Sequence, residues 1–301
     1  VDDDYPYFMS VAFAPEYRAK VLVNYITKNP KELTVKNMLE MHNQKYSIPA
    51  EKIVSFIKKI DLDNIKLTDI EQSSLDLLEN WDFSMDKTSS AASIYSMTRE
   101  KLVEQIINLN YGGLAKETIE WKNYGAVSHV RRFLLPLINE HLGDNKSFLL
   151  SNKESWNELI IKSFKSAILI LIDNFGDDIN KWSWGNLHKT NHQHPLSSVY
   201  KEYSEILNPK HVSASGDGDT PFAGSSDKNF NVVAASVNRY AHDPSNWENS
   251  RWIVPLGSSG NPGSKNYYDQ LDLWAEGETI PQIWNWEEIT SSCSKQLIKK
   301  I

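Results

Sequence analysis

The pattern of apolar residues in this chain of 301 residues changes at Gly176. Before Gly176, apolar side chains recur every three or four residues, as in amphipathic helices. After it, short alternating runs stand between loops rich in Gly, Ser, Asp and Pro. We therefore predict an α+β chain, with a mostly helical segment over residues 1–176 and a mixed strand, loop and helix segment over residues 177–301. Because no repeat or low-complexity tract marks the boundary, we expect both segments to pack into the same domain.

Local signals place the helices and strands. A proline in the first turn, a capping serine or threonine, or a capping box predicts helices that begin near Pro15, Thr34, Pro49, Thr68-x-x-Glu71, Ser90, Ser128 and Ser151-x-x-Glu154. Alternating or short apolar runs predict strands at Trp182, Trp184 and Asn186, over residues 230–237 and over residues 251–256.

Composition excludes several classes of protein. The chain is 40% hydrophobic, enough for a sizeable core, and its formal net charge of -7 offers no basic field to a nucleic-acid backbone. Cys293 is the only cysteine, so neither an internal disulfide nor a thiolate metal cluster can form within the chain. The longest apolar run, residues 167–172, is far shorter than the roughly 20 residues that span a bilayer. We expect neither nucleic acid nor a membrane as a partner.

Arg18 occupies an unusual position in the first predicted helix. It falls in the middle of the apolar stripe that Val21, Leu22, Tyr25 and Ile26 form, and it lies in the first turn, where the helix dipole disfavours a cation. We therefore expect its guanidinium group to have a buried partner.

Three histidines, His188, His192 and His194, lie in the segment WSWGNLHKTNHQHPL. Their even spacing would place them on one face of a strand, from which imidazole groups can converge on zinc. However, Pro195 interrupts any regular strand, and most such histidines are surface or hydrogen-bonded residues. A zinc site is therefore the less favoured interpretation.

Asp217 and Asp219 in SGDGDTPF have the spacing of the first two carboxylates of a calcium loop. The twelfth position, where an EF-hand has a bidentate glutamate, is Lys228, and this excludes an EF-hand. We predict instead a tight turn in which Gly216 and Gly218 adopt positive φ and the carboxylates accept backbone hydrogen bonds.

The segment from Leu256 to Gly277, LGSSGNPGSKNYYDQLDLWAEG, is dense in glycine, serine and aromatic residues. Its GSSG resembles a nucleophile elbow only superficially, and the sequence identifies no base for its serines. The predicted roles are a turn shaped by Gly257, Gly260 and Gly263 and a following helix anchored by Tyr268, Leu271 and Trp274.

Six segments together resemble the penicillin amidase (penicillin acylase) family of N-terminal nucleophile hydrolases. In chain order they read DDYPYF followed by APEYRAKVL, LTVKNMLEMHNQKYSIPA, LLENWDFSMDKTSSAASIY, WGNLHKTNHQHPL, SGDGDTPF and SRWIVPLGSSGNPGSKNYYDQLDLWAEGE. They span nearly the whole chain in the family's order. The last segment departs from the family's GQSG and HYxDQ at Ser258 and Asn266, two local differences that leave the resemblance standing.

The resemblance implies an αββα sandwich and a hydrolase that cleaves linear amides through an acyl-enzyme. Family enzymes cleave their own precursor to expose an N-terminal serine, whose α-amino group is the base for its own hydroxyl. Val1 cannot do this. The resemblance therefore implies the C-terminal part of a β subunit, inactive alone, with the catalytic serine, the oxyanion asparagine and the family's usual calcium ligands upstream. Arg18 of APEYRA matches the family's arginine that helps to position the nucleophile, and it is the one site residue that we predict in this chain.

The implied partners are a small-molecule amide and the rest of the same precursor, namely the α subunit and the N-terminal part of the β subunit. We assign no cofactor or metal to this chain and leave calcium to the full enzyme. Because family members are commonly exported, a periplasmic or extracellular location is expected. Two alternatives stay open: a non-catalytic helical binding module with zinc at the three histidines, and an inactive family member.

Overall fold

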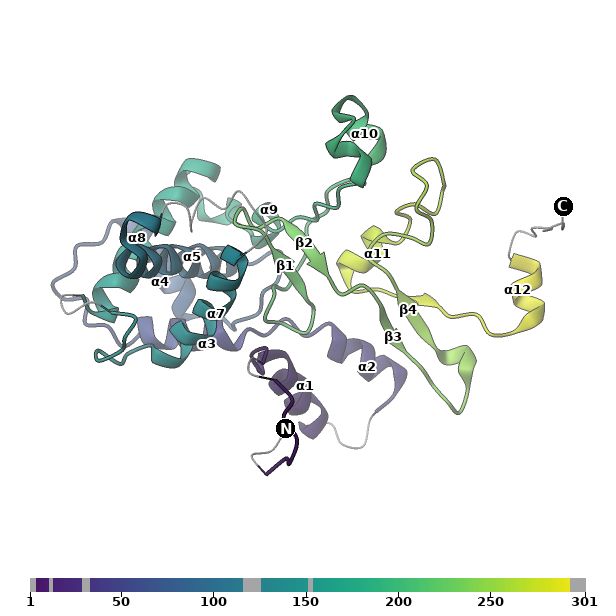
Figure 1. Ribbon diagram of the computed structural model, residues 1–301, viewed down its shortest axis with the longest axis horizontal. Helices are drawn as coiled ribbons and strands as arrows, with labels where there is room; N and C mark the ends of the chain where they lie inside the picture. The colour runs from purple at the N-terminus through teal and green to yellow at the C-terminus, as the bar shows by residue number, and fades with distance from the viewer. Residues whose placement is uncertain (1–3, 11–12, 29–32, 116–125, 151–153, 293–301) are drawn as a thin grey trace.

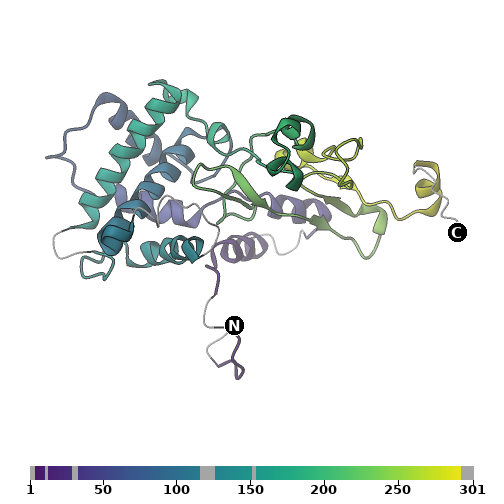
Figure 2. The same ribbon diagram turned by 45° about the horizontal axis from the view of Figure 1, so that its top comes forward.

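A computed structural model describes residues 4–10, 13–28, 33–115, 126–150 and 154–292. The helices of the first half are α1 (Tyr17–Lys28), α2 (Val35–His42), α3 (Ile48–Ile57), α4 (Asp69–Glu79), α5 (Ser90–Tyr111), α7 (Ala126–His141) and α8 (Trp156–Phe175), and a 3-10 turn (Gly112–Leu114) follows α5. Both views show α3, α4, α5, α7 and α8 gathered into a helical lobe at one end of an elongated molecule (Figure 1, Figure 2).

The helical lobe is built around the contact between α5 and α8. α8 begins after a capping box in which the Ser155 hydroxyl accepts from the Glu158 amide and the Glu158 carboxylate accepts from the Ser155 amide. Phe164 on α8 and Ile106 on α5 are fully buried in the same apolar core, and burial of such a side chain contributes about 1.5–3 kcal/mol. None of the helices in the described ranges is long and apolar enough to cross a membrane.

The second half has shorter elements and a smaller core. Its elements are α9 (Trp184–Leu187), α10 (Ser204–Leu207), β1 (Gly224–Ser226), β2 (Val232–Ala235), β3 (Arg239–Ala241), β4 (Arg251–Ile253), α11 (Leu271–Glu276), β5 (Ile280–Pro281) and α12 (Trp286–Ser292), with 3-10 turns at Ile179–Lys181, Pro195–Ser198, Lys201–Tyr203 and Trp247–Asn249. β1 and β2 form an antiparallel pair, and β3, β4 and β5 form an antiparallel sheet in that order. The second core consists of Ala214, Phe222, Val232, Ile253, Trp274 and Ala275.

Backbone hydrogen bonds join the two halves of the chain. The amides of Trp184 and Gly185 donate to carbonyl oxygens of the segment that precedes α5, at 3.0 and 2.7 Å. The Phe222 amide donates to the Gln44 carbonyl oxygen at 3.0 Å, just after α2. The loops of the second half are therefore fixed to the ends of the first-half helices.

The structure confirms the predicted α+β class. Among the described residues, all five strands lie in the second half, and α8 ends at Phe175 with Gly176 as its C-cap at φ 78°. The capping box at Thr68 and Glu71 forms as predicted, and β2 and β4 lie within two of the predicted strands. The division of the chain into two segments at Gly176 stays a prediction.

The strand predicted at Trp182, Trp184 and Asn186 is wrong. Residues 179–187 form a 3-10 turn followed by α9. Both tryptophans are fully buried, as the alternation suggested, but their indole N–H groups donate to different carbonyl oxygens, those of Gly176 at 2.8 Å and Gly216 at 2.9 Å. A buried indole N–H requires such a partner, and the helical turns orient both rings to reach one.

The start of α8 also differs from the prediction. Ser151 of the predicted capping box lies outside the described residues, and the N-cap of the helix is Ser155, four residues later, in the box of Ser155 and Glu158. The two boxes have the same sequence spacing, and the structure uses the one directly before the apolar stripe that starts at Trp156.

The packing of α8 predicts a strong effect of truncating Phe164. Phe164→Ala should lower the free energy of unfolding by about 3–5 kcal/mol, because it removes a fully buried ring and leaves a cavity. Urea denaturation followed by circular dichroism measures this loss. Leu169→Ala is the matched control on the same helix, since Leu169 is 61% exposed and should cost less than about 0.5 kcal/mol. Equal losses for the two variants would contradict the packing described.

Candidate functional site

Arg18 lies exposed on α1, next to the helix start. On the same helix, Lys20 forms an ion pair with Glu16 at 2.9 Å, whereas Arg18 forms no ion pair or hydrogen bond with any residue in the described ranges. The expected buried partner of Arg18 is therefore absent from the described part of the chain. The role that we predicted for Arg18 stays a prediction.

His188 is fully buried, and its contacts are with other residues of the second half. Its ring stacks on Trp184, with centroids 4.5 Å apart and an interplanar angle of 14°. Nδ1 lies 2.9 Å from the Phe230 carbonyl oxygen and, because a carbonyl only accepts, Nδ1 carries the proton of this hydrogen bond. Burial lowers the pKa of His188 to about 4, so the imidazole is neutral at pH 7.

The other two histidines of the segment have separate surroundings. His194 caps a 3-10 turn, where its Nδ1 accepts from the Leu196 amide at 3.1 Å. His192 is half-buried, and burial, followed by the charge of His211, lowers its pKa. The part of the chain that the structure describes contains no group of three His, Cys, Asp or Glu side chains placed to hold a metal ion. The three histidines therefore do not converge as the zinc alternative requires.

The SGDGDTPF loop forms the predicted tight turn around Gly216. Gly216 has φ 77°, and a Cβ there would lie 1.9 Å from the Phe222 carbonyl oxygen, so only glycine fits. The Asp217 carboxylate accepts from the Asp219 amide at 2.7 Å, as predicted. Positive φ at Gly218 is wrong, because the turn is closed instead by the Asp217 amide, which donates to the Thr220 hydroxyl at 2.9 Å.

A charged pair fixes this loop to the helical lobe. Arg99 on α5 donates through Nη1 to Oδ2 of Asp219 at 2.8 Å, across 120 residues of sequence. Burial, followed by the neighbouring charge of Asp219, raises the pKa of Asp217 to about 6, and the charge of Arg99 opposes this shift. Asp219 is thus neutralised by an arginine, which gives this loop a structural role in place of the calcium role that its carboxylate spacing resembled.

Arg239 on β3 is a buried cation that sequence analysis missed. It is only 5% exposed, and its guanidinium lies 4.0 Å from the Phe222 ring centroid and 4.4 Å from that of Trp274. Its Nη1 donates to the Trp274 carbonyl oxygen at 3.2 Å. Burial lowers the pKa of Arg239 to about 9. The strand pattern gave no signal for this residue, because both aromatic partners come from other parts of the chain.

The GSSG turn is held by backbone contacts and does not form a nucleophile site. A Cβ on Gly257 would lie 2.2 Å from the Asn266 carbonyl oxygen, which also accepts from the Ser259 amide at 3.0 Å. The Ser259 hydroxyl accepts from the Asn261 amide at 3.2 Å, a turn contact that supplies no base. The predicted turn is therefore confirmed at Gly257, whereas a Cβ would find no close backbone contact at Gly260.

The helix after this turn is anchored by residues close to those predicted. Leu271 and Trp274 are fully buried, and the Trp274 indole N–H donates to the Ser236 carbonyl oxygen at 3.1 Å. Tyr268 is 41% exposed and is not an anchor. Its neighbour Tyr267 is buried instead, and the Tyr267 hydroxyl donates to the Leu207 carbonyl oxygen at 2.6 Å.

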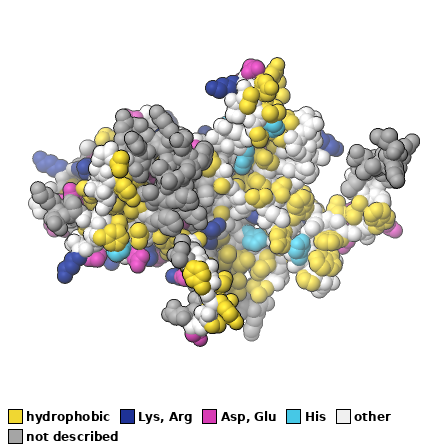
Figure 3. Space-filling view, viewed as in Figure 1, with side chains coloured by type: hydrophobic (Ala, Val, Ile, Leu, Met, Phe, Trp, Pro, Cys, Tyr) yellow, Lys and Arg dark blue, Asp and Glu magenta, His cyan; other side chains and the backbone are white. Residues whose placement is uncertain are grey.

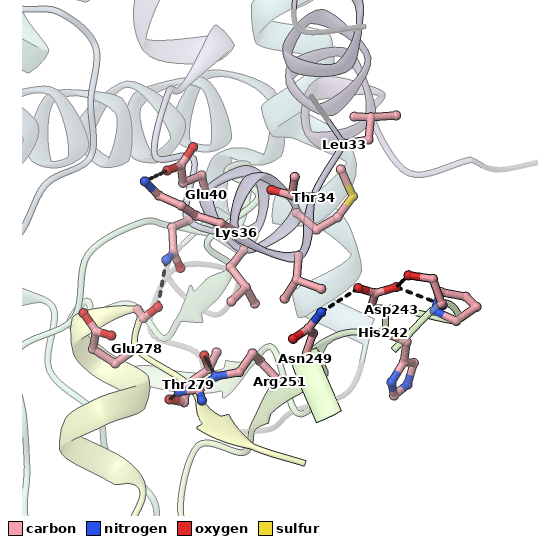
Figure 4. Close-up of a pocket in the computed structure, with 17 residues that line it drawn as sticks. Leu33, Thr34, Lys36, Glu40, His242, Asp243, Asn249, Arg251, Glu278 and Thr279 are labelled. Carbon is pink, nitrogen blue, oxygen red and sulfur yellow. Dashed lines mark hydrogen bonds and ion pairs between the residues drawn. The ribbon is translucent and has the colours of Figure 1, made fainter. Parts of the chain in front are cut away.

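An open groove lies between α2 and the turn that joins β3 to β4, with a volume of about 920 Å³ (Figure 4). Leu33 and Thr34 form one rim, and Figure 4 shows Asn249 and Arg251 on the opposite side. Arg251 donates through Nη2 to the Thr279 carbonyl oxygen at 2.7 Å. The volume suits a small molecule or a peptide segment, but this arginine is already occupied in holding β5 to β4.

The pKa of His188 predicts how stability depends on pH. The pKa of His188 is lower in the folded state than the unfolded value of 6.5, so the neutral imidazole stabilises the fold. This contribution to the free energy of unfolding is fully present above pH 6.5 and is lost as the pH falls toward about 4. Between pH 7 and pH 5, the free energy of unfolding of the wild-type protein should fall by about 2 kcal/mol more than that of His188→Gln. Urea denaturation at each pH measures the difference in slope.

A control separates His188 from the rest of its segment. His194→Gln changes a capping histidine of the same segment and should follow the wild-type pH dependence more closely than His188→Gln does. For Asp217→Asn the sign is opposite. As pH falls through about 6, wild-type protein should gain stability relative to Asp217→Asn, because protonation of the Asp217 carboxylate stabilises the fold. Parallel curves for wild type and His188→Gln would refute the buried neutral imidazole.

Comparison with known proteins identifies relatives along the whole chain. The "Penicillin acylase 2 proenzyme" of Pseudomonas sp. (strain SE83) is 25% identical over 312 residues, which cover 99% of this chain and 37% of that protein. The "Acyl-homoserine lactone acylase QuiP" of Pseudomonas putida is 30% identical over 129 residues, which cover 42% of this chain and 15% of that protein. The chain thus spans well under half the length of these curated relatives.

A solved structure and a family profile agree with these relatives. The fold is similar to that of a thermostable penicillin G acylase from Alcaligenes faecalis, with a TM-score of 0.50 and 16% identity over 98% of this chain and 54% of that one. The sequence profile described as Penicillin amidase matches residues 1–291. The chain therefore belongs to the penicillin amidase family.

Proposed function

We propose that this chain is the C-terminal part of the β subunit of a hydrolase that cleaves linear amide bonds, with its serine nucleophile upstream of Val1. The observation that carries the proposal is the alignment of 99% of the chain with only 37% of a penicillin acylase proenzyme. The family profile over residues 1–291 supports the same assignment. The contacts of the GSSG turn and of the buried His188 agree with it, since neither forms a serine–base pair.

The proposed reaction follows the chemistry of N-terminal nucleophiles. The serine hydroxyl attacks the amide carbonyl carbon, and the serine's own α-amino group accepts the hydroxyl proton and passes it to the leaving amine. Backbone N–H groups and an asparagine, both outside this chain, hold the negative oxygen of the tetrahedral intermediate. Water then attacks the resulting ester, which releases the acid and restores the free serine.

In this proposal the chain supplies the scaffold and one positioning residue, Arg18. The guanidinium is exposed on α1 and makes no contact that occupies it within the described residues, so it is free to meet an upstream carbonyl or amide oxygen. Its rigid, planar set of donors can hold two such oxygens in a fixed arrangement, whereas the rotating ammonium group of lysine does not fix their geometry. Arg18 would act through the groups that it orients and would not itself react.

The substrate class that we propose is a linear amide such as an acylated amine, a penicillin-type side-chain amide or an acyl-homoserine lactone. The partners would be the α subunit and the N-terminal part of the β subunit. Calcium in the full enzyme would have its ligands upstream of Val1. Export to the periplasm or the medium is proposed on the family resemblance.

Activity should require more than this chain. The purified 301-residue chain should show no turnover of a phenylacetyl or fatty-acyl chromogenic amide, whereas the processed full-length protein should hydrolyse at least one of them. A chromogenic assay of the two proteins side by side measures this. Robust turnover by the chain alone would contradict the proposal that its nucleophile lies upstream. An inactive full-length protein would identify a family member that has lost its activity.

Replacing Arg18 should affect the reaction and spare the fold. In the full-length enzyme, Arg18→Ala should lower kcat by about 100-fold or more, with KM and the melting temperature nearly unchanged, because it removes oriented hydrogen-bond donors from the transition state. Arg18→Lys should recover only part of kcat. Lys20→Ala, which breaks an exposed ion pair on the same helix, is the control and should leave kcat unaltered. An unchanged kcat in Arg18→Ala would remove Arg18 from the site.

A further inference from the structure

The described residues among the first 28 expose more apolar surface than a stable isolated fold normally leaves in water. We define the N-terminal apolar face as the six exposed side chains Tyr7, Phe8, Met9, Phe13, Val23 and Ile26. Phe8 is 82% exposed and Tyr7 is 72% exposed. Figure 3 shows hydrophobic atoms on the projecting N-terminal arm.

α1 receives little support from the rest of the described chain. Val21 is its only buried residue, and no other element packs broadly along it. Tyrosine hydroxyl groups help to hold it: the Tyr17 hydroxyl accepts from Asn139 Nδ2 at 3.2 Å, and the Tyr25 hydroxyl donates to Glu40 Oε2 at 2.9 Å. A helix of 12 residues is marginal without packing, so α1 requires a further surface against its open side.

The open side of α1 is apolar. At 3.6 residues per turn, Ala19, Leu22, Val23 and Ile26 share one side of the helix, and the side chain of Val21 points to the other. The views in Figures 1 and 2 place α1 at the margin of the molecule, beside the N-terminal arm. The arm and the open side of α1 therefore both leave apolar side chains uncovered by the described chain.

The length of the relatives indicates what this partner is. The chain accounts for 37% of a related proenzyme and 54% of a related solved chain, so a large part of the polypeptide of each relative lies outside the region that this chain matches. Residues 4–13 contain one charged side chain, Asp4, which favours an apolar partner over an acidic or basic one. The arm is also the part of the chain nearest in sequence to any upstream residues.

We infer that the N-terminal apolar face is the docking surface for the upstream, nucleophile-bearing part of the same precursor. This inference rests on the proposed function. Docking there would bury the aromatic side chains of the arm and cover the open side of α1. It would also place α1, and with it Arg18, against the segment that carries the serine.

The test is reconstitution of the enzyme from two polypeptides. The upstream part, from the proposed serine to the residue before Val1, is expressed separately and titrated with the 301-residue chain in a calorimeter. Wild-type chain should bind at a 1:1 ratio. The double variant Val23→Asp with Ile26→Asp should bind at least about 30-fold more weakly, the effect of losing an interface hot spot. The matched control is Leu169→Asp on α8, which is 61% exposed and lies outside the face.

The outcomes separate this inference from the proposed function. Equal binding by wild type and the double variant, or no binding at all by wild type, would overturn the docking surface even if the full-length enzyme is active. A dimer of the chain alone in light scattering that the double variant abolishes would overturn it too, because a second copy would be the occupant. Tight binding that the double variant weakens, with no amide turnover by the processed full-length protein, would support the docking surface and count against the proposed function. The melting temperature of the double variant must equal that of Leu169→Asp, since α1 contributes little to the core.

Discussion

The two halves of the chain meet at Gly216, whose backbone contacts both of them. Its amide donates to the Met85 carbonyl oxygen at 2.7 Å, and its carbonyl oxygen accepts from the Trp184 indole N–H at 2.9 Å. The left-handed backbone at this residue brings the Phe222 carbonyl oxygen to a distance that no Cβ could tolerate. The Arg99–Asp219 pair, three residues further along, fixes the same loop to α5. The position of the second core therefore depends on this loop.

Two buried polar groups of the second half, His188 and Arg239, are held by contacts that stabilise the fold. Burial keeps His188 neutral, and its Nδ1–H group donates a hydrogen bond to a backbone carbonyl oxygen. The Arg239 guanidinium lies against two aromatic rings. Groups fixed in this way stabilise a unique arrangement of loops but have no freedom to transfer protons to a substrate. This agrees with a chain that belongs to an acylase family and is proposed to receive its nucleophile from elsewhere.

Sequence reasoning succeeded where the signal is local. The capping box at Thr68, the end of α8 at Gly176 and the turn at Gly216 each follow from a few adjacent residues, and the structure confirms them. It failed where a contact joins distant segments. Arg99 and Asp219 are 120 residues apart, and nothing near either residue predicts the other.

The candidate site was harder to predict than the fold. The alternation of Trp182 and Trp184 suggested a strand, but burial of both rings is compatible with a strand and with helical turns. The positions of the carbonyl oxygens that accept from the two indole N–H groups decide between them, and these positions cannot be read from the local sequence. The buried partner expected for Arg18 was inferred from an apolar stripe of which the structure buries only Val21 completely. A stripe shows that a surface must be covered, but it cannot show whether the cover comes from the same chain.

The central claim is that this chain is the scaffold of an N-terminal nucleophile amidase and does not contain the nucleophile. The most direct measurement is peptide mapping by mass spectrometry of the processed full-length enzyme after inactivation with a serine-directed sulfonyl fluoride. The account predicts a single adduct, on an N-terminal serine upstream of Val1. An adduct on any serine of the 301 residues, such as Ser258 or Ser259, accompanied by loss of activity, would contradict it.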